Sequence, residues 1–300
     1  MPKLEYEKKN FRQEALNTIA QAESIIQNYQ AQGFSLTLRQ LYYQFVARAL
    51  IPNTEKSYTK LGNIISDARR AGMIDWDAIV DRTRYLRKLS SWGKPQNILE
   101  SARDSYHRDL WANQDKRIEV WIEKDALVGV IEKVCQENDV PFFSCRGYVS
   151  DSEMWAGAMR AVRFEDDTDK NSQQTLILHL GDHDPSGIDM TRDIQDRLRL
   201  FTYYRDVVVK RIALTMEQIE ELQPPPNPAK VTDSRYESYV AEYGTESWEL
   251  DALEPQYIAN LIEENILAER DEIKWQELVG EQEVERKQIA EIIERWGELF

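Results

Sequence analysis

The stretch Thr175-Leu176-Ile177-Leu178-His179-Leu180-Gly181-Asp182-His183-Asp184-Pro185-Ser186-Gly187 decides the fold of this chain. Its first half is a run of large apolar residues, which is typical of a strand buried on both faces of a parallel sheet. Pro185 cannot continue a strand ladder, but it suits the first turn of a helix. The sequence therefore predicts a strand over 175–180, a helix from Pro185, and two carboxylates, Asp182 and Asp184, at their junction.

Such a junction is where ligands bind in open α/β sheets, because the carboxyl ends of parallel strands lie along one edge. A second predicted strand, 117–122, ends at Glu123, which places a third carboxylate on that edge. Neighbouring carboxylates repel each other unless a cation or a proton intervenes, and oxygen ligands suit Mg²⁺. We therefore interpret Asp182 and Asp184 as candidate Mg²⁺ ligands, with Glu123 on the same edge of the sheet. The alternative is structural, with Asp184 as a helix N-cap and Asp182 as a turn residue.

Strands and helices alternate through the middle of the chain. We expect strands at 117–122, 140–144, 175–180 and 206–213, separated by helices at 126–136, 151–164 and 185–201. Strict alternation predicts a doubly wound parallel sheet. Further helices are predicted at 96–111, 215–222, 255–268 and 281–296. The predicted fold is α/β multidomain, with a helical winged-helix unit (1–90), a linker helix (91–115), the sheet domain (116–214) and an acidic, mainly helical C-terminal region (215–300).

The first ninety residues predict three helices, at about 5–31 and 37–49 and from the turn at 51–54 to about Ala71. Residues 73–81 alternate partly, as a short hairpin would, which together with the helices predicts a winged-helix (CAP-like) unit. The third helix has a polar, partly basic face that suits a DNA major groove, although a solvated face is the alternative. A basic cluster suited to a phosphate backbone follows at 82–88. The candidate DNA contacts are Lys56, Asn63, Arg70, Arg82 and Arg84.

Tyr43 and Arg39 lie on the second predicted helix, away from its apolar stripe. On a wheel of about 100° per residue, Tyr43 falls about 40° from Arg39, so both side chains can meet one phosphate. A tyrosine nucleophile needs its pKa of about 10 lowered or its proton removed. A neighbouring guanidinium helps with this and stabilises charge on the reacting phosphate. The alternative is an exposed Tyr–Arg stacking pair.

Composition sets limits on location and partners. The chain has no stretch of about 20 apolar residues and no apolar signal core at its start, and its two cysteines give no metal spacing, so we expect a cytoplasmic protein. The net charge is −15, which alone argues against nucleic acid. However, residues 1–110 hold 17 basic and 12 acidic residues, and residues 217–300 hold 7 and 22. The basic first third is compatible with an N-terminal DNA-binding unit.

Together these motifs resemble a known family. A glutamate after one strand and Gly-Asp-x-Asp-Pro-x-Gly after a later one look like the Toprim domain. Arg39-Gln40-Leu41-Tyr42-Tyr43 in a winged helix that precedes it is similar to the nucleophile motif, Arg-[Asp/Glu]-[Ile/Val]-[Phe/Tyr]-Tyr, of the topoisomerase VI A subunit and the related meiotic double-strand-break transesterase. The stretch 249–253 is similar to an acidic segment that closes the family's Toprim region.

The resemblance implies double-stranded DNA as substrate and a covalent 5′-phosphotyrosyl intermediate on Tyr43. It implies Tyr43, Arg39 and Glu123 as catalytic residues and Mg²⁺ on Glu123, Asp182 and Asp184. It also implies a homodimer in which each tyrosine acts in trans on the partner's site. Gln40 departs from the pattern, because the family usually carries an acid there.

Two other functions stay open from the sequence. Related Toprim nucleases lack a catalytic tyrosine and hydrolyse DNA with metal alone. A non-catalytic DNA-binding component of a larger complex is the third possibility, with the acidic tail docking a partner. We also expect that ATP-driven strand passage would need a separate ATPase subunit, because the sequence shows no ATPase domain.

Overall fold

The computed structural model describes residues 3–81, 89–164, 173–203 and 207–299. At its centre is a four-stranded parallel sheet with the strand order β2-β1-β3-β4. The strands are β1 (Lys116–Ile122), β2 (Phe142–Ser144), β3 (Gln174–Leu180) and β4 (Val207–Ala213). The predicted α/β class and parallel sheet are therefore confirmed. The central pair, β1 and β3, runs in unbroken register from Lys116 opposite Gln174 to Ile122 opposite Leu180.

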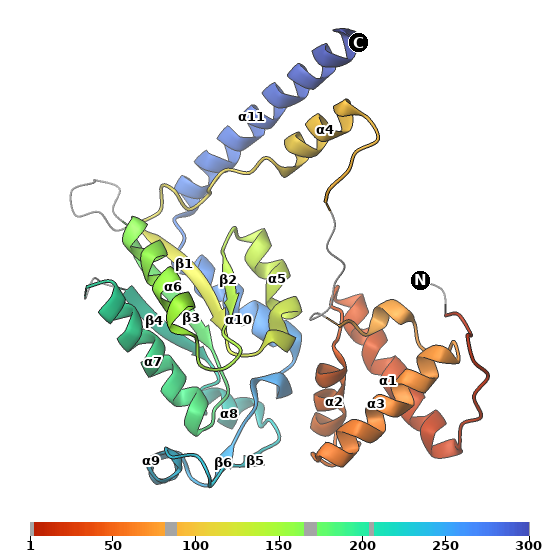
Figure 1. Ribbon diagram of the computed structural model, residues 1–300. Helices are drawn as coiled ribbons and strands as arrows, with labels where there is room; N and C mark the ends of the chain where they lie inside the picture. The colour runs from red at the N-terminus through yellow and green to blue at the C-terminus, as the bar shows by residue number, and fades with distance from the viewer. Residues whose placement is uncertain (1–2, 82–88, 165–172, 204–206, 300) are drawn as a thin grey trace.

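Helices cover both faces of this sheet because successive side chains of a strand point to opposite faces. One face of β1 and β3, which includes Val120 and Leu178, packs in a core with α5 (Val128–Glu137) and α10 (Pro255–Leu267). The other face, which includes Trp121 and Ile177, packs in a second core with α6 (Asp151–Phe164) and α7 (Pro185–Phe201). Figure 1 shows these helix pairs on either side of the strands. Both cysteines, Cys135 and Cys145, are buried.

The N-terminal helical unit consists of α1 (Gln13–Ala31), α2 (Leu38–Ala47) and α3 (Glu55–Arg70), which share a buried apolar core. The helix α2 begins at a capping box, in which the Thr37 hydroxyl accepts from the Gln40 backbone and the Gln40 side chain accepts from the Thr37 backbone. The first helix starts later than predicted, because Tyr6 and Glu7 instead donate backbone hydrogen bonds to the carbonyl of Arg70.

The hairpin expected at 73–81 is wrong. The structure has a short 3₁₀ helix there, η1 (Trp76–Ala78), and a single bridge from Leu36 to Ile79. The Asp75 carboxylate accepts a hydrogen bond from the backbone of Asp77, a local turn contact that competes with strand pairing. Trp76 packs under the Arg69 guanidinium, which holds the turn against α3.

The last third of the chain wraps back over the sheet. It contains α8 (Met216–Leu222), a small antiparallel pair of β5 (Asn227–Pro228) and β6 (Glu246–Ser247), α9 (Tyr236–Tyr243), the 3₁₀ turn η3 (Leu250–Ala252) and α10. A 3₁₀ turn, η2 (Asp125–Leu127), precedes α5. The last helix, α11 (Glu272–Leu299), starts earlier than predicted and lies beside α4 (Pro95–Ser105), which ends earlier than predicted; the two extend together from the body (Figure 1). No described helix is both long and apolar enough to cross a membrane.

Candidate functional site

Glu123 and Asp182 meet at the carboxyl edge of the sheet. β1 and β3 end in register at Ile122 and Leu180, and the backbone N–H of Glu123 continues the ladder to the Leu180 carbonyl at 2.8 Å. One carboxylate oxygen of Glu123 then accepts a hydrogen bond from the backbone N–H of Asp182 at 2.9 Å. The parallel register therefore brings together two residues that are far apart in sequence, as the strand pattern predicts.

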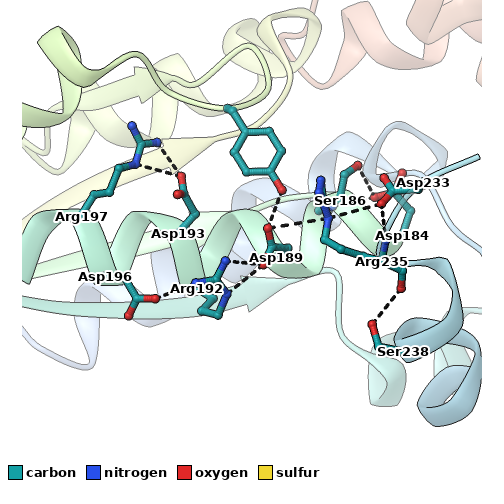
Figure 2. Close-up of polar contacts among 12 residues, drawn as sticks. Asp184, Ser186, Asp189, Arg192, Asp193, Asp196, Arg197, Asp233, Arg235 and Ser238 are labelled. Carbon is teal, nitrogen blue, oxygen red and sulfur yellow. Dashed lines mark hydrogen bonds and ion pairs between the residues drawn. The ribbon is translucent and has the colours of Figure 1, made fainter.

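Asp184 serves as the N-cap of α7. Its Oδ1 accepts hydrogen bonds from the Gly187 backbone at 2.6 Å and from the Ser186 hydroxyl at 2.9 Å. Figure 2 shows Asp184 and Ser186 at the start of this helix, beside ion pairs that join Asp189 to Arg192 and Arg235. Asp184 is therefore a helix N-cap, which was the structural alternative, and this role uses its Oδ1 oxygen.

Asp182 has two partners of its own. Its Oδ1 accepts from the Leu250 backbone at 2.8 Å, and its Oδ2 lies 2.8 Å from the Lys124 ammonium. Burial raises the pKa of Asp182 to about 7, with Glu123 and Glu249 acting in the same direction and Lys124 against them. Burial also raises the pKa of Glu123, and Asp184 adds to this through its charge.

The expected Mg²⁺ set of Glu123, Asp182 and Asp184 stays a prediction. Among the residues described, no group of three or more Asp, Glu, His or Cys side chains is arranged to hold a metal ion as it stands. The donor chemistry nevertheless suits a hard cation, because carboxylate oxygens concentrate here with their pKa values raised by burial and mutual repulsion.

Lys124 is the cation around which the acidic side chains gather. Its ammonium pairs with Asp182, with Asp251 at 3.6 Å and with Glu249, and its side chain is only 13 % exposed. Burial acts to lower the pKa of Lys124, but the three carboxylates outweigh burial and raise that pKa above its usual value. We call Lys124, Asp182, Glu249 and Asp251 the Lys124 cluster.

Tyr43 lies against the Lys124 cluster. Although we expected it to lie away from the apolar stripe of α2, it is a buried core residue with an exposure of 7 %. The helix α2 packs against η2, which follows Lys124, and against η3, which contains Asp251. The centroid of the Tyr43 ring is 5.9 Å from the Lys124 ammonium nitrogen and 5.7 Å from Cζ of Arg39.

The Tyr43 phenol is held in its neutral form. Burial is the largest cause that raises its pKa to about 12, and Glu249 adds to the rise, whereas Lys124 and Arg39 oppose it. Beside the ring a cavity of about 290 Å³ is lined by Arg39, Tyr42, Tyr43, Asn53, Thr54, Glu55 and Tyr58. This cavity provides space for a ligand next to Tyr43.

Arg39 connects α2 to the Lys124 cluster. Its Nε lies 3.3 Å from Oδ2 of Asp251, and one terminal nitrogen lies 3.8 Å from Glu249. The guanidinium thus pairs with acids of the C-terminal region and also lies near the Tyr43 ring. This ring is buried, whereas the stacking alternative requires an exposed pair.

The candidate DNA contacts on α3 share one exposed face. Lys56, Asn63 and Arg70 are all exposed and recur every seven residues, so they lie along one side of the helix. The other two candidates, Arg82 and Arg84, fall outside the described residues.

Both histidines of the decisive stretch are structural. His179 is buried, and its Nδ1 lies 2.9 Å from the Thr191 hydroxyl. His183 is also buried, and its Nδ1 lies 2.8 Å from the Tyr239 hydroxyl.

Sequence reasoning missed Arg211 and gave no role to Lys124, Glu249 or Asp251. Arg211 donates to the carbonyls of Gly181, Asp182 and Gly187, and so fixes the loop that carries the aspartates. The available signal was a charged residue inside the apolar strand 207–213, because a charge is placed in a buried strand only where partners satisfy it.

Comparison with protein-family models and with curated proteins finds no match to this chain.

Proposed function

We propose that this protein is a Mg²⁺-dependent DNA-cleaving enzyme of the Toprim type, in which Tyr43 attacks a phosphodiester. One observation carries the proposal: Tyr43 lies within 6 Å of two cations, Lys124 and Arg39, on a cluster of acids at the carboxyl edge of the sheet. The proposal takes the helical unit as a winged-helix DNA-binding unit and the sheet as a Toprim domain, as the sequence resemblance implies.

The chain's own residues provide the chemistry of attack. The Tyr43 oxygen forms a bond to phosphorus, the bond from phosphorus to the 3′ oxygen breaks, and a 5′-phosphotyrosyl enzyme results. Glu249, whose charge acts on the Tyr43 phenol, accepts the phenolic proton, and water protonates the leaving 3′ oxygen. Arg39 and Lys124 stabilise the negative charge that develops on the phenolate and the phosphate.

A divalent cation completes the proposed site. Glu123 and Asp182, with the second oxygen of Asp184, would hold Mg²⁺, which when bound neutralises charge on the reacting phosphate. The exposed face of α3, with Lys56, Asn63 and Arg70, would contact the DNA backbone and groove. A homodimer would cut both strands, and any ATP-driven strand passage would require a separate ATPase partner.

The burial of Tyr43 favours a second candidate function, DNA hydrolysis with water as the nucleophile. A phenol whose pKa is raised to about 12 is a weak nucleophile at neutral pH. In this alternative Tyr43 is a structural residue that packs α2 against the Lys124 cluster.

Plasmid cleavage distinguishes the candidates. The full chain is incubated with supercoiled plasmid and Mg²⁺, the reaction is stopped with detergent, and protein-linked 5′ ends are sought. We expect Tyr43→Phe to abolish both cleavage and linkage. Tyr42→Phe is the matched control, because it removes a neighbouring hydroxyl that donates to Asn53 and to the carbonyl of Thr54.

The other outcomes are equally informative. Cleavage by Tyr43→Phe without linked ends would identify the hydrolytic enzyme. DNA binding that survives Asp182→Ala, with no cleavage by the unaltered protein, would identify a non-catalytic binding component and reject both enzymatic proposals.

A further inference from the structure

Three carboxylates converge on one ammonium group in the Lys124 cluster. Asp182 follows β3, whereas Glu249 and Asp251 flank the first residue of η3, so separate segments of the chain are brought to a common centre. Oδ2 of Asp182 lies 2.8 Å from the ammonium nitrogen and Oδ2 of Asp251 lies 3.6 Å from it, with Glu249 also in contact. The Lys124 ammonium nitrogen is thus surrounded by carboxylate oxygens, as a bound metal cation would be.

Asp251 points to a ligand at this centre. Its side chain is fully buried, and neither of its carboxylate oxygens accepts a hydrogen bond. Its nearest described cations, Arg39 and Lys124, lie at 3.3 and 3.6 Å, beyond the 2.7–2.9 Å of a strong charged hydrogen bond. A buried carboxylate without hydrogen bonds is costly, and a small, hard cation would satisfy it at closer range.

We propose that Asp182, Glu249 and Asp251 form a divalent-cation site, for Mg²⁺ or Mn²⁺, whose centre the Lys124 ammonium occupies when no metal is bound. Metal binding displaces Lys124, whose flexible four-carbon side chain can move aside. The three carboxylates carry one more negative charge than Lys124 and Arg39 together balance. The presence of Lys124 at the centre also explains why no ready-made metal group exists among the described residues.

This site shares Asp182 with the metal site of the proposed function, and Glu249 and Lys124 with its proposed chemistry, but metal binding here does not depend on DNA cleavage. The test therefore measures metal binding in the absence of DNA. It remains valid even if the protein has no DNA-cleaving activity. Binding of Mn²⁺ to the full chain is measured by electron paramagnetic resonance, and binding of Mg²⁺ by titration calorimetry.

Lys124→Met gives the sharpest prediction. Because the ammonium competes with the metal, its removal should tighten Mn²⁺ binding roughly tenfold. A residue with only a structural role would weaken binding or leave it unchanged when removed, and either result would overturn the proposal. Lys124→Arg keeps the charge and should bind Mn²⁺ no more tightly than the unaltered protein.

A second pair of variants keeps the proposal testable if Lys124→Met does not fold. Asp251→Asn and Glu249→Gln each remove one negative charge while Lys124 stays in place, so both relieve repulsion in the folded protein. Each should weaken Mn²⁺ binding roughly tenfold, whereas Asp193→Asn, at a carboxylate that pairs with Arg197 on α7 outside both proposed metal sites, should not. Unchanged binding in both cluster variants would show that the metal does not occupy this centre.

Discussion

Nε of Arg39 lies 3.3 Å from Oδ2 of Asp251, so a helix of the N-terminal unit is paired with a fully buried carboxylate of the C-terminal region. The same guanidinium reaches Glu249 and lies near the Tyr43 ring. Tyr29 and Asn53 add further hydrogen bonds across this contact, to Glu254 and Asn227. The position of Tyr43 relative to the sheet is therefore fixed by contacts among three parts of the chain.

We expect Arg39→Met to destabilise the protein by roughly 2 kcal/mol, because it leaves Asp251 buried with one cation fewer. Arg48→Met is the matched control: Arg48 caps the end of α2 and pairs with Glu254, whose side chain is 55 % exposed whereas that of Asp251 is buried, so its loss should cost less than about 1 kcal/mol. Urea unfolding of both variants measures the difference. Equal losses would contradict a special role for the contact between Arg39 and Asp251.

Gly187→Ala should be severely destabilising. A Cβ at this position would lie 2.2 Å from the backbone oxygen of Asp182, and backbone cannot move aside as a flexible side chain can. We expect a loss of roughly 3 kcal/mol, with the aspartate loop displaced. Gly280→Ala on the exposed part of α11 meets nothing within 4 Å and should instead stabilise by about 0.5–1 kcal/mol. Thermal unfolding of the two variants gives the comparison, and two shifts of the same sign would refute it.

Stability should fall in mild acid because of His179. Burial lowers its pKa from 6.5 to about 3, so between these values the unfolded chain binds a proton that the folded chain does not. The contribution of neutral, buried His179 to the free energy of unfolding is therefore complete above pH 6.5 and declines as the pH falls towards 3. A second proton would also sit on Nε2, which has no hydrogen-bond partner.

The measurement compares the unaltered protein with His179→Gln at pH 7.5 and pH 5. Over this range the unaltered protein should lose roughly 2 kcal/mol more than the variant. Asp182, whose raised pKa acts in the opposite direction, is present in both proteins and cancels from the difference. Parallel pH profiles for the unaltered protein and His179→Gln would disprove the assignment.

The sheet and one part of the site could be predicted from sequence, because they depend on local patterns. The apolar run before Pro185 identifies a central strand. Because β1 and β3 end at the same edge of the sheet, Glu123 and Asp182, which follow them, lie side by side. The surroundings of Tyr43 could not be predicted in this way. A helical wheel describes only the face that α2 presents to its own helical unit, whereas the face that buries Tyr43 is covered by Lys124 and Glu249 from other segments.

The DNA-binding prediction for α3 is tested by salt dependence. If Lys56 and Arg70 each neutralise a phosphate, substitution of either by alanine should weaken binding to unrelated duplexes alike and reduce the slope of log affinity against log salt by about 1. Lys287→Ala removes an equally exposed charge from α11, which extends away from the helical unit. Loss of affinity in Lys287→Ala as large as in the α3 variants would assign the effect to net charge rather than to this face.

Whether Tyr43 acts on its own chain can be decided by mixing two inactive variants. Sequence resemblance implies action in trans, but in this structure the Tyr43 ring lies 5.9 Å from Lys124, which itself contacts Asp182 of the same chain. If the site is complete within one chain, mixing Tyr43→Phe with Asp182→Asn should restore no cleavage, because each chain lacks one essential group. Action in trans would restore about a quarter to a half of the activity, since mixed dimers would contain one intact pair. Protein-linked DNA ends are counted after subunit exchange, and native mass spectrometry confirms that mixed dimers have formed.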